Sequence, residues 1–312
     1  MKRTLLAGGL LLATTSHALA NIDIQFDFSY DTTHFFSSNP DSIAALNAAA
    51  SIFETRFQDN LAAIVSSGSN DFSLNFFNPS SSPYDFDDPG ITLGRQSIAA
   101  NVIRIYAGGY DFTNGVLGVG GPGGYACSGS FAFCGTAVDR GQGETQNTYG
   151  NDGTVVSADA IDFATWGGSI SFDSSGTNWY FGASSAGLNA SSYDFYSVAV
   201  HELAHVLGFA TADSFYNRIL GNSFVGPTAG MVALTGDGHW ADGTLGTVDG
   251  IVQEASMTAT LASGQRKYFT DLDFAAMQDI GWQVAAVPEI ETWAMLLAGI
   301  GLVGFATRRR LH

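Results

Sequence analysis

The stretch VAVHELAHVLGFATAD, residues 198–213, carries the pattern on which the interpretation of the whole chain depends. His201 and His205 are four residues apart, so on a helix they stand one turn above each other on the same face. Two imidazoles placed in this way can bind one tetrahedral zinc ion. Glu202 is displaced around the helix, where its carboxylate can reach a metal-bound water without being a ligand. The pattern therefore predicts a metal-binding helix that also carries a general base.

The chemistry that these residue types favour is hydrolysis. A zinc ion lowers the pKa of a bound water and polarises the scissile carbonyl, while Glu202 takes the proton and later passes it to the leaving amine. The alternative is a core helix whose histidines are merely hydrogen-bonded. With only six His in 312 residues, the H-E-x-x-H spacing is seldom met by accident, which favours the metal site.

The residues that follow the motif indicate a sharp turn. Gly208 stands three residues after His205 and can take the left-handed conformation that ends a helix. HELAHVLGF resembles the extended zincin pattern of the metzincins, in which this turn brings a third ligand back under the metal. The usual metzincin spacing would place His or Asp at Thr211, whose neutral hydroxyl is a poor zinc ligand. The third ligand is therefore expected further along the chain.

Two residues are the main candidates for that third ligand. His239 lies in GDGHWADG, and Glu254 is the only Glu between the motif and the C-terminal segment. A Glu254 ligand would resemble the thermolysin-like gluzincins, which take this carboxylate from a second helix, but its surroundings, residues 248–264, show no convincing helical cap or face. Asp213 and Asp237 are the nearest remaining oxygen donors.

The order of the later motifs favours His239. Gly-His-Trp at 238–240 is followed by EASM, which ends at Met257, and by FTDLDFAAMQDIGW at 269–282. This order resembles the leishmanolysin-like metzincins, which place the third His after an insertion, then a Met in a tight turn, then a helix. Met257 is also consistent with ordinary core packing. The resemblance implies the following site: His201, His205 and His239 as zinc ligands, Glu202 as the base, and Met257 as the hydrophobic floor beneath the metal.

The remaining pattern indicates an α+β fold. Alternating apolar residues at 21–31 predict a half-buried strand, and apolar positions at three- and four-residue steps predict a helix from Asp41 to about Ile64. Further strands are expected at 72–77, 101–107, 167–173 and 178–183. GGSISFD, residues 167–173, is a candidate for the sheet edge against which an extended peptide pairs. A second C-terminal helix begins at Thr270 with a capping-box Asp273 and stops at Gly281.

These elements predict one zincin- or metzincin-like domain over residues 21–286. Its N-terminal part, 21–208, would hold a twisted mixed sheet and the active-site helix, and a smaller C-terminal part, 209–286, would face it across the metal cleft. The two cysteines, Cys127 and Cys134, lie in one Gly-rich loop and predict a local disulfide. A zinc site on this pair is the weaker alternative, because no His or further Cys lies nearby in the chain.

Both termini have the character of export signals. Residues 1–20 combine a basic start, a short apolar run and small residues, which predicts a signal peptide cleaved before Asn21; an N-terminal anchor is the alternative. Residues 287–312 place a Pro-Glu pair before an apolar run and an Arg cluster. This order resembles the PEP-CTERM sorting signal of exopolysaccharide-producing Gram-negative bacteria. It implies transient membrane association, an exosortase-type sorting enzyme as partner, and release to the cell surface or matrix; a permanent anchor is the alternative.

The charge balance excludes some partners. A net charge of −17 argues against nucleic acid and anionic membranes, which both need a basic surface. The sequence thus predicts a secreted zinc metalloendopeptidase that acts on proteins or peptides. The alternative is a non-catalytic matrix protein with a structural zinc site, although three His without a fourth protein ligand favour catalysis. Acidic loops at 84–90 and 246–250 leave an accompanying Ca²⁺ site open, without EF-hand spacing.

Overall fold

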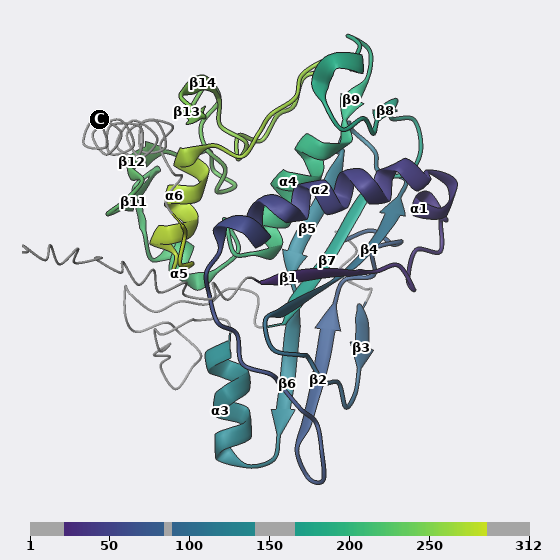
Figure 1. Cartoon of the computed structure of the whole chain (residues 1–312), viewed down its shortest axis with the longest axis vertical. Helices are drawn as coiled ribbons and strands as arrows, with labels where there is room; N and C mark the ends of the chain where they lie inside the picture. The colour runs from purple at the N-terminus through teal and green to yellow at the C-terminus, as the bar shows by residue number, and fades with distance from the viewer. Residues whose placement is uncertain (1–21, 84–88, 141–165, 286–312) are drawn as a thin grey trace, which may run out of the picture.

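The computed structural model describes residues 22–83, 89–140 and 166–285, which form a mixed α/β architecture with several sheets (Figure 1). The expected α+β class is thereby confirmed at this level. The predicted signal peptide at 1–20, the sorting segment at 287–312 and most of the acidic loop at 84–90 lie outside the described residues. Within the described ranges, no helix combines the length and the apolar character that a membrane-spanning helix requires.

The central sheet is mixed and has four strands in the order β1-β4-β7-β5. The first three strands are parallel, and the fourth runs antiparallel to β7. The strands are β1 (Asp23–Asp27), β4 (Val102–Tyr110), β7 (Gly167–Asp173) and β5 (Gly118–Pro122). The assignment of GGSISFD to the sheet edge is therefore wrong, because β7 pairs on both sides and all seven of its residues are buried. The edge on that side is the Gly-rich strand β5.

Helices α1 (Phe35–Ser38), α2 (Pro40–Arg56) and α4 (Phe195–Val206) pack on this sheet, and α2 lies along α4 (Figure 1). The helix predicted to run to Ile64 ends at Arg56, eight residues earlier than expected. The apolar residues beyond it are still buried, but they lie in an extended segment. Gln58 N–H donates to Gln283 O, and Ala285 N–H donates to Arg56 O. These residues pair with a distant part of the chain instead of continuing the helix. The local periodicity of apolar residues does not reveal such pairing.

A separate arm lies below the central sheet in Figure 1. It contains β2 (Asp71–Phe76), β3 (Ile91–Leu93), β6 (Gly124–Ser128) and α3 (Phe131–Asp139). The strands pair antiparallel in the order β3-β2-β6. Cys127 in β6 and Cys134 in α3 form the predicted disulfide. A second, smaller core joins the arm to the central sheet, because it includes Phe72 and Leu74 of β2 together with Val102 and Tyr106 of β4.

The C-terminal elements gather to one side of the central sheet (Figure 1). They follow two short paired strands, β8 (Trp179–Tyr180) and β9 (Tyr193–Asp194), which precede α4. The elements after α4 are α5 (Asp213–Tyr216), β10 (Ile219–Leu220), β11 (Ser223–Gly226), β12 (Gly230–Ala233), β13 (Leu245–Val248), β14 (Ile251–Glu254) and α6 (Asp271–Asp279). The capping box of Thr270 and Asp273 at α6 is present as predicted. Buried residues before and after position 208 belong to one continuous core, which includes Phe53, Leu203, Trp240 and Met277.

Candidate metal centre

Helix α4 is fixed at both ends. At its start the Asp194 carboxylate accepts hydrogen bonds from Ser197 N–H (3.0 Å) and Ser197 Oγ (2.6 Å), and it forms a buried ion pair with Arg266 at 2.6 Å. At its end Gly208 has φ of 110°, a conformation that costs glycine least. This turn directs the chain toward Phe209, whose N–H donates to Ala204 O at 2.9 Å. The helix is thus held rigidly where its histidines project.

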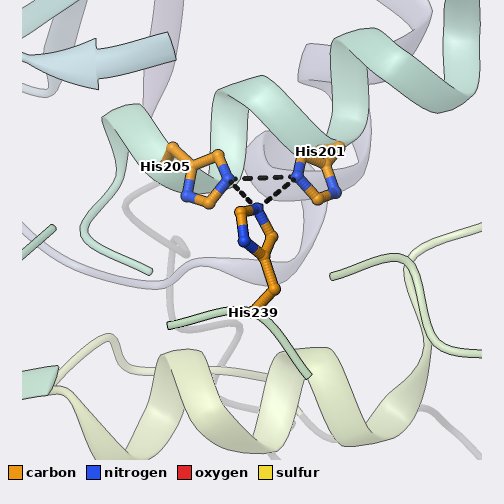
Figure 2. Close-up of side chains that lie close together, drawn as sticks. All are labelled: His201, His205 and His239. Carbon is orange, nitrogen blue, oxygen red and sulfur yellow. Dashed lines mark hydrogen bonds between the residues drawn. The ribbon is translucent and has the colours of Figure 1, made fainter. Parts of the chain in front are cut away.

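Three imidazoles meet beside this helix (Figure 2). The Nε2 atom of His201 lies 3.0 Å from that of His205 and 3.1 Å from that of His239, and the latter two are 3.1 Å apart. His201 and His205 come from consecutive turns of α4, and His239 comes from the loop between β12 and β13. The helix-plus-distant-histidine arrangement is the one that the sequence favoured. These ring nitrogens are close enough together to hold a metal ion.

Each imidazole is oriented by an oxygen at its other nitrogen. His201 Nδ1 lies 2.8 Å from Ser256 O, and His205 Nδ1 lies 2.9 Å from Phe209 O. A carbonyl can only accept, so these Nδ1 atoms carry the proton and leave the Nε2 lone pair free for a metal. His239 Nδ1 lies 3.0 Å from the Asp237 carboxylate, but without well-aligned hydrogen-bond geometry, so this contact is mainly electrostatic.

Their surroundings keep the two histidines of α4 neutral. Burial is the largest cause that lowers the pKa of His205, to about 4, and the nearby His239 adds to it. Burial likewise lowers the pKa of His201 well below its usual value, with further lowering from His205 and His239. Neutral imidazole is the form that binds a metal, so at neutral pH no proton has to be displaced.

A single buried carboxylate supports two sides of the site. Asp273 Oδ1 accepts a hydrogen bond from Trp240 Nε1 at 2.8 Å, and its Oδ2 accepts one from Ser256 N–H at 2.9 Å. Trp240 follows His239 directly, and Ser256 supplies the carbonyl that orients His201. The sequence pattern predicted Asp273 only as a helix cap, because nothing in a capping box indicates which distant residues share the same carboxylate.

Glu202 lies against the edge strand β5. Its carboxylate is only 8% exposed and accepts a hydrogen bond from the backbone of Gly120. Burial raises the pKa of Glu202 to about 8, and the Gly120 hydrogen bond partly opposes this shift. A Cβ at Gly120 would lie 2.3 Å from Glu202 O, and one at Gly118 would lie 3.0 Å from Glu202 Cγ. Glycine at these positions is what allows the strand to approach the helix so closely.

A cavity of about 540 Å³ contains the three histidines and Glu202. The strand residues Gly118–Gly120 line one part of it, and the loop residues Thr258–Leu261 line another. Both the candidate base and the candidate ligands are therefore reachable by a molecule that enters this cavity.

No protein-family model matches the chain, and no curated protein is similar to it in sequence.

The alternative third ligands are not part of the cluster of Nε2 atoms. Glu254 ends strand β14 and forms an ion pair with Lys267 at 2.9 Å. Thr211 Oγ1 donates to His205 O at 2.6 Å, and Asp213 begins the short helix α5. Asp237 is beside His239 but contacts the ring at Nδ1 rather than at the cluster of Nε2 atoms.

Met257, the predicted hydrophobic floor beneath the metal, is fully buried in the main core. Its O accepts a hydrogen bond from Trp240 N–H at 2.9 Å, and its N–H donates to Asp273 at 3.3 Å. It is not among the described residues that line the cavity. In the part of the chain that the structure describes, His201, His205 and His239 are the only group of three or more His, Cys, Asp or Glu at metal-holding distance. The GTVDG segment, residues 246–250, is not a loop throughout: residues 246–248 belong to strand β13, and residues 249–250 form the turn to β14.

Proposed function

We propose that this protein is a zinc-dependent metalloendopeptidase of metzincin architecture, in which His201, His205 and His239 hold the metal and Glu202 is the general base. The observation that carries the proposal is the convergence of three Nε2 atoms within 3.1 Å of one another, beside a buried carboxylate in an open cavity. The order of motifs that resembles leishmanolysin-like metzincins supports the same assignment.

The residues present fit a zinc ion. Nitrogens about 2.1 Å from a tetrahedral zinc would be about 3.4 Å apart. The observed separations of 3.0 to 3.1 Å need only a small outward movement of the rings. Three neutral imidazoles leave one coordination position for water or substrate, which is typical of catalytic rather than structural zinc sites. When bound, the metal would supply Lewis acidity that acidifies water and polarises a carbonyl.

The chain's own residues account for the proton transfers. Glu202 is placed to accept a proton from the attacking water and to donate it to the leaving amine. The Gly120 N–H group keeps the carboxylate in one orientation. Burial favours the protonated form of Glu202, and a neighbouring cation would oppose this effect and favour the ionised base.

The substrate class follows from the edge strand. Among the described strands β5 pairs only with β7, and its residues Gly118–Gly120 line the cavity. Backbone groups on a free strand edge bind an extended peptide by adding it as a further strand. This strand takes the role that the sequence pattern had assigned to residues 167–173. A protein or peptide is therefore the proposed substrate.

Export and surface localisation are part of the proposal. They rest on the signal-like residues 1–20 and on the resemblance of residues 287–312 to a PEP-CTERM signal, which implies an exosortase-type partner and a Gram-negative cell surface or matrix. Mass spectrometry of protein released from cells should show the loss of residues 1–20 and processing near Val287 to Thr292. Retention of residues 293–306 would support a lasting anchor instead.

The decisive experiment combines metal content with hydrolysis. The purified protein should contain one zinc per chain, hydrolyse casein or a peptide, and lose activity when a chelator removes the metal. Glu202→Gln should keep the zinc and reduce hydrolysis by about two or more orders of magnitude, which is the scale of losing a general base. A parent protein that binds zinc without hydrolysing any peptide would instead support the structural matrix protein.

A further inference from the structure

Besides the histidines and Glu202, the cavity is lined by residues from an earlier turn of α4 and by polar residues that follow Met257 in the chain. Ser197 and Val198 line it from the preceding turn of the helix, and Thr258–Leu261 line it from the loop after Met257. Lys267 also contributes to this lining. Among the described residues that line the cavity, Lys267 is the only Lys or Arg.

The ammonium of Lys267 is buried, and its counter-ion lies away from the cavity. Nζ donates to Thr258 Oγ1 and to Thr260 O, both at 2.6 Å, and lies 2.9 Å from the Glu254 carboxylate. The Lys267 side chain is 4% exposed, against 25% for Glu254, and Glu254 is not part of the cavity lining. A buried cation stays charged only when it is compensated. Because Glu254 lies outside the lining, the ion pair presents its cationic end to the cavity.

A second polar group in the same cavity has its hydrogen-bonding capacity unused. The Ser256 hydroxyl is buried and has no hydrogen-bond partner among the described residues. Ser256 lines the cavity as well. A buried hydroxyl is costly to leave unpaired, but this oxygen has almost no accessible surface, so it meets an entering group only if the cavity wall moves.

We propose that this end of the cavity accommodates an acidic side chain, Asp or Glu, of the substrate peptide, and that Lys267 is the specificity-determining residue. The inference rests on the proposed peptidase function. The chain's net charge of −17 disfavours acidic peptides at long range, but ions screen such repulsion beyond about 10 Å at 0.1 M salt. Inside the cavity the nearby ammonium therefore decides the preference.

The test uses peptides that differ only in Glu or Gln at one position, with the pair moved through each position around the cleaved bond. The parent enzyme should show a kcat/KM about tenfold higher for Glu than for Gln at one position, because the cationic end of the ion pair attracts a carboxylate more strongly than a neutral amide. Lys267→Met should bring this ratio to about one.

The ratio separates specificity from loss of structure. Disorder of the loop at 258–260 would slow the Glu and Gln peptides together and leave their ratio unchanged. A ratio of about one at every position of the parent, or a ratio that survives in Lys267→Met, would overturn the inference.

Binding of the same peptide pairs to the full chain carrying Glu202→Gln, measured by fluorescence anisotropy, provides the readout if hydrolysis fails. Preferential binding of the Glu peptide that disappears when Lys267→Met is added would support the acidic pocket while the peptidase function fails. Equal binding of both peptides would refute the pocket itself.

Discussion

The indole Nε1 of Trp240 donates a 2.8 Å hydrogen bond to the carboxylate of Asp273, which lies in the first turn of α6, 33 residues later in the chain. Because Asp273 also accepts from Ser256 N–H, one carboxylate sets the positions of the residue after His239 and of the carbonyl that orients His201. The positions of His239 in the loop and His201 in the helix are therefore coupled through Asp273, which contacts neither imidazole.

Asp273→Asn should weaken zinc binding by roughly 10- to 100-fold, which is typical for outer partners of metal ligands. An amide replaces one acceptor oxygen by a donor, so it cannot accept all the hydrogen bonds from Trp240, Ser256 and Thr270. Zinc affinity is measured by competition with a chromogenic chelator. Asp271→Asn, an exposed acid in the same helical turn, is the matched control and should leave the affinity near that of the parent. Equal effects of the two variants would contradict the role given to Asp273.

His239→Ala should abolish stoichiometric zinc and hydrolysis together, because two imidazoles from one helix do not fix the metal geometry alone. Glu254→Ala should leave zinc largely in place, since this carboxylate is paired with Lys267. Elemental analysis of the two purified variants provides the comparison. Zinc loss in Glu254→Ala alone would make the site gluzincin-like, and zinc loss in neither variant would direct attention to Asp213 or Asp237.

Gly120→Ala should destabilise the protein by about 1–3 kcal/mol, the usual cost of overpacking, and lower hydrolysis further than that loss explains. The added methyl would lie 2.3 Å from Glu202 O, so strand β5 or the helix has to move. Gly124→Ala is the control, because its added methyl would only make an ordinary contact with Asn75 O at 3.9 Å. Chemical denaturation and peptide hydrolysis measure the two effects. A Gly120→Ala protein as active as the control would show that the approach of β5 to α4 is not needed.

Asp59 should make the protein less stable above pH 6 than below pH 4. Burial is the main cause that raises its pKa from 3.8 to about 6, with Gln283 N–H opposing. A carboxyl whose folded pKa is raised contributes stability below its unfolded pKa, and this contribution is lost as pH rises through the folded pKa. About two pKa units correspond to about 3 kcal/mol.

Asp59→Asn should therefore flatten the pH profile of the free energy of unfolding between pH 4 and 7. Denaturant titrations at several pH values test this, with the exposed Asp111→Asn as control. An unchanged profile would mean that another group causes the pH dependence.

Local sequence patterns predicted the elements whose structure depends on near neighbours. The turn at Gly208, the capping box of Asp273 and the disulfide of Cys127 and Cys134 are examples. The predicted end of α2 was wrong, because residues after Arg56 pair with a distant part of the chain near Gln283. The periodicity of apolar residues cannot show such pairing. The prediction of the edge strand was wrong for a similar reason, since the order of strands in a sheet is a non-local property.

Within the site, residue types and motif order brought His239 together with the two helical histidines. The supporting contacts of Gly120, Asp237 and Lys267 gave no sequence signal, because each depends on which residues fold beside it. A run of glycines before a cysteine, for example, predicts a loop as readily as a strand that presses against a helix.

Two of the three histidines are oriented by main-chain carbonyls, those of Ser256 and Phe209, and the third by the side chain of Asp237. A main-chain carbonyl stays in place whatever side chain its residue carries, so mutational drift at 209 and 256 can leave the ring orientations intact. Position 237 is different, since its carboxylate is lost with any substitution but Glu. Natural variation or engineering that alters the rate of metal exchange, without disturbing the fold, should therefore concentrate there.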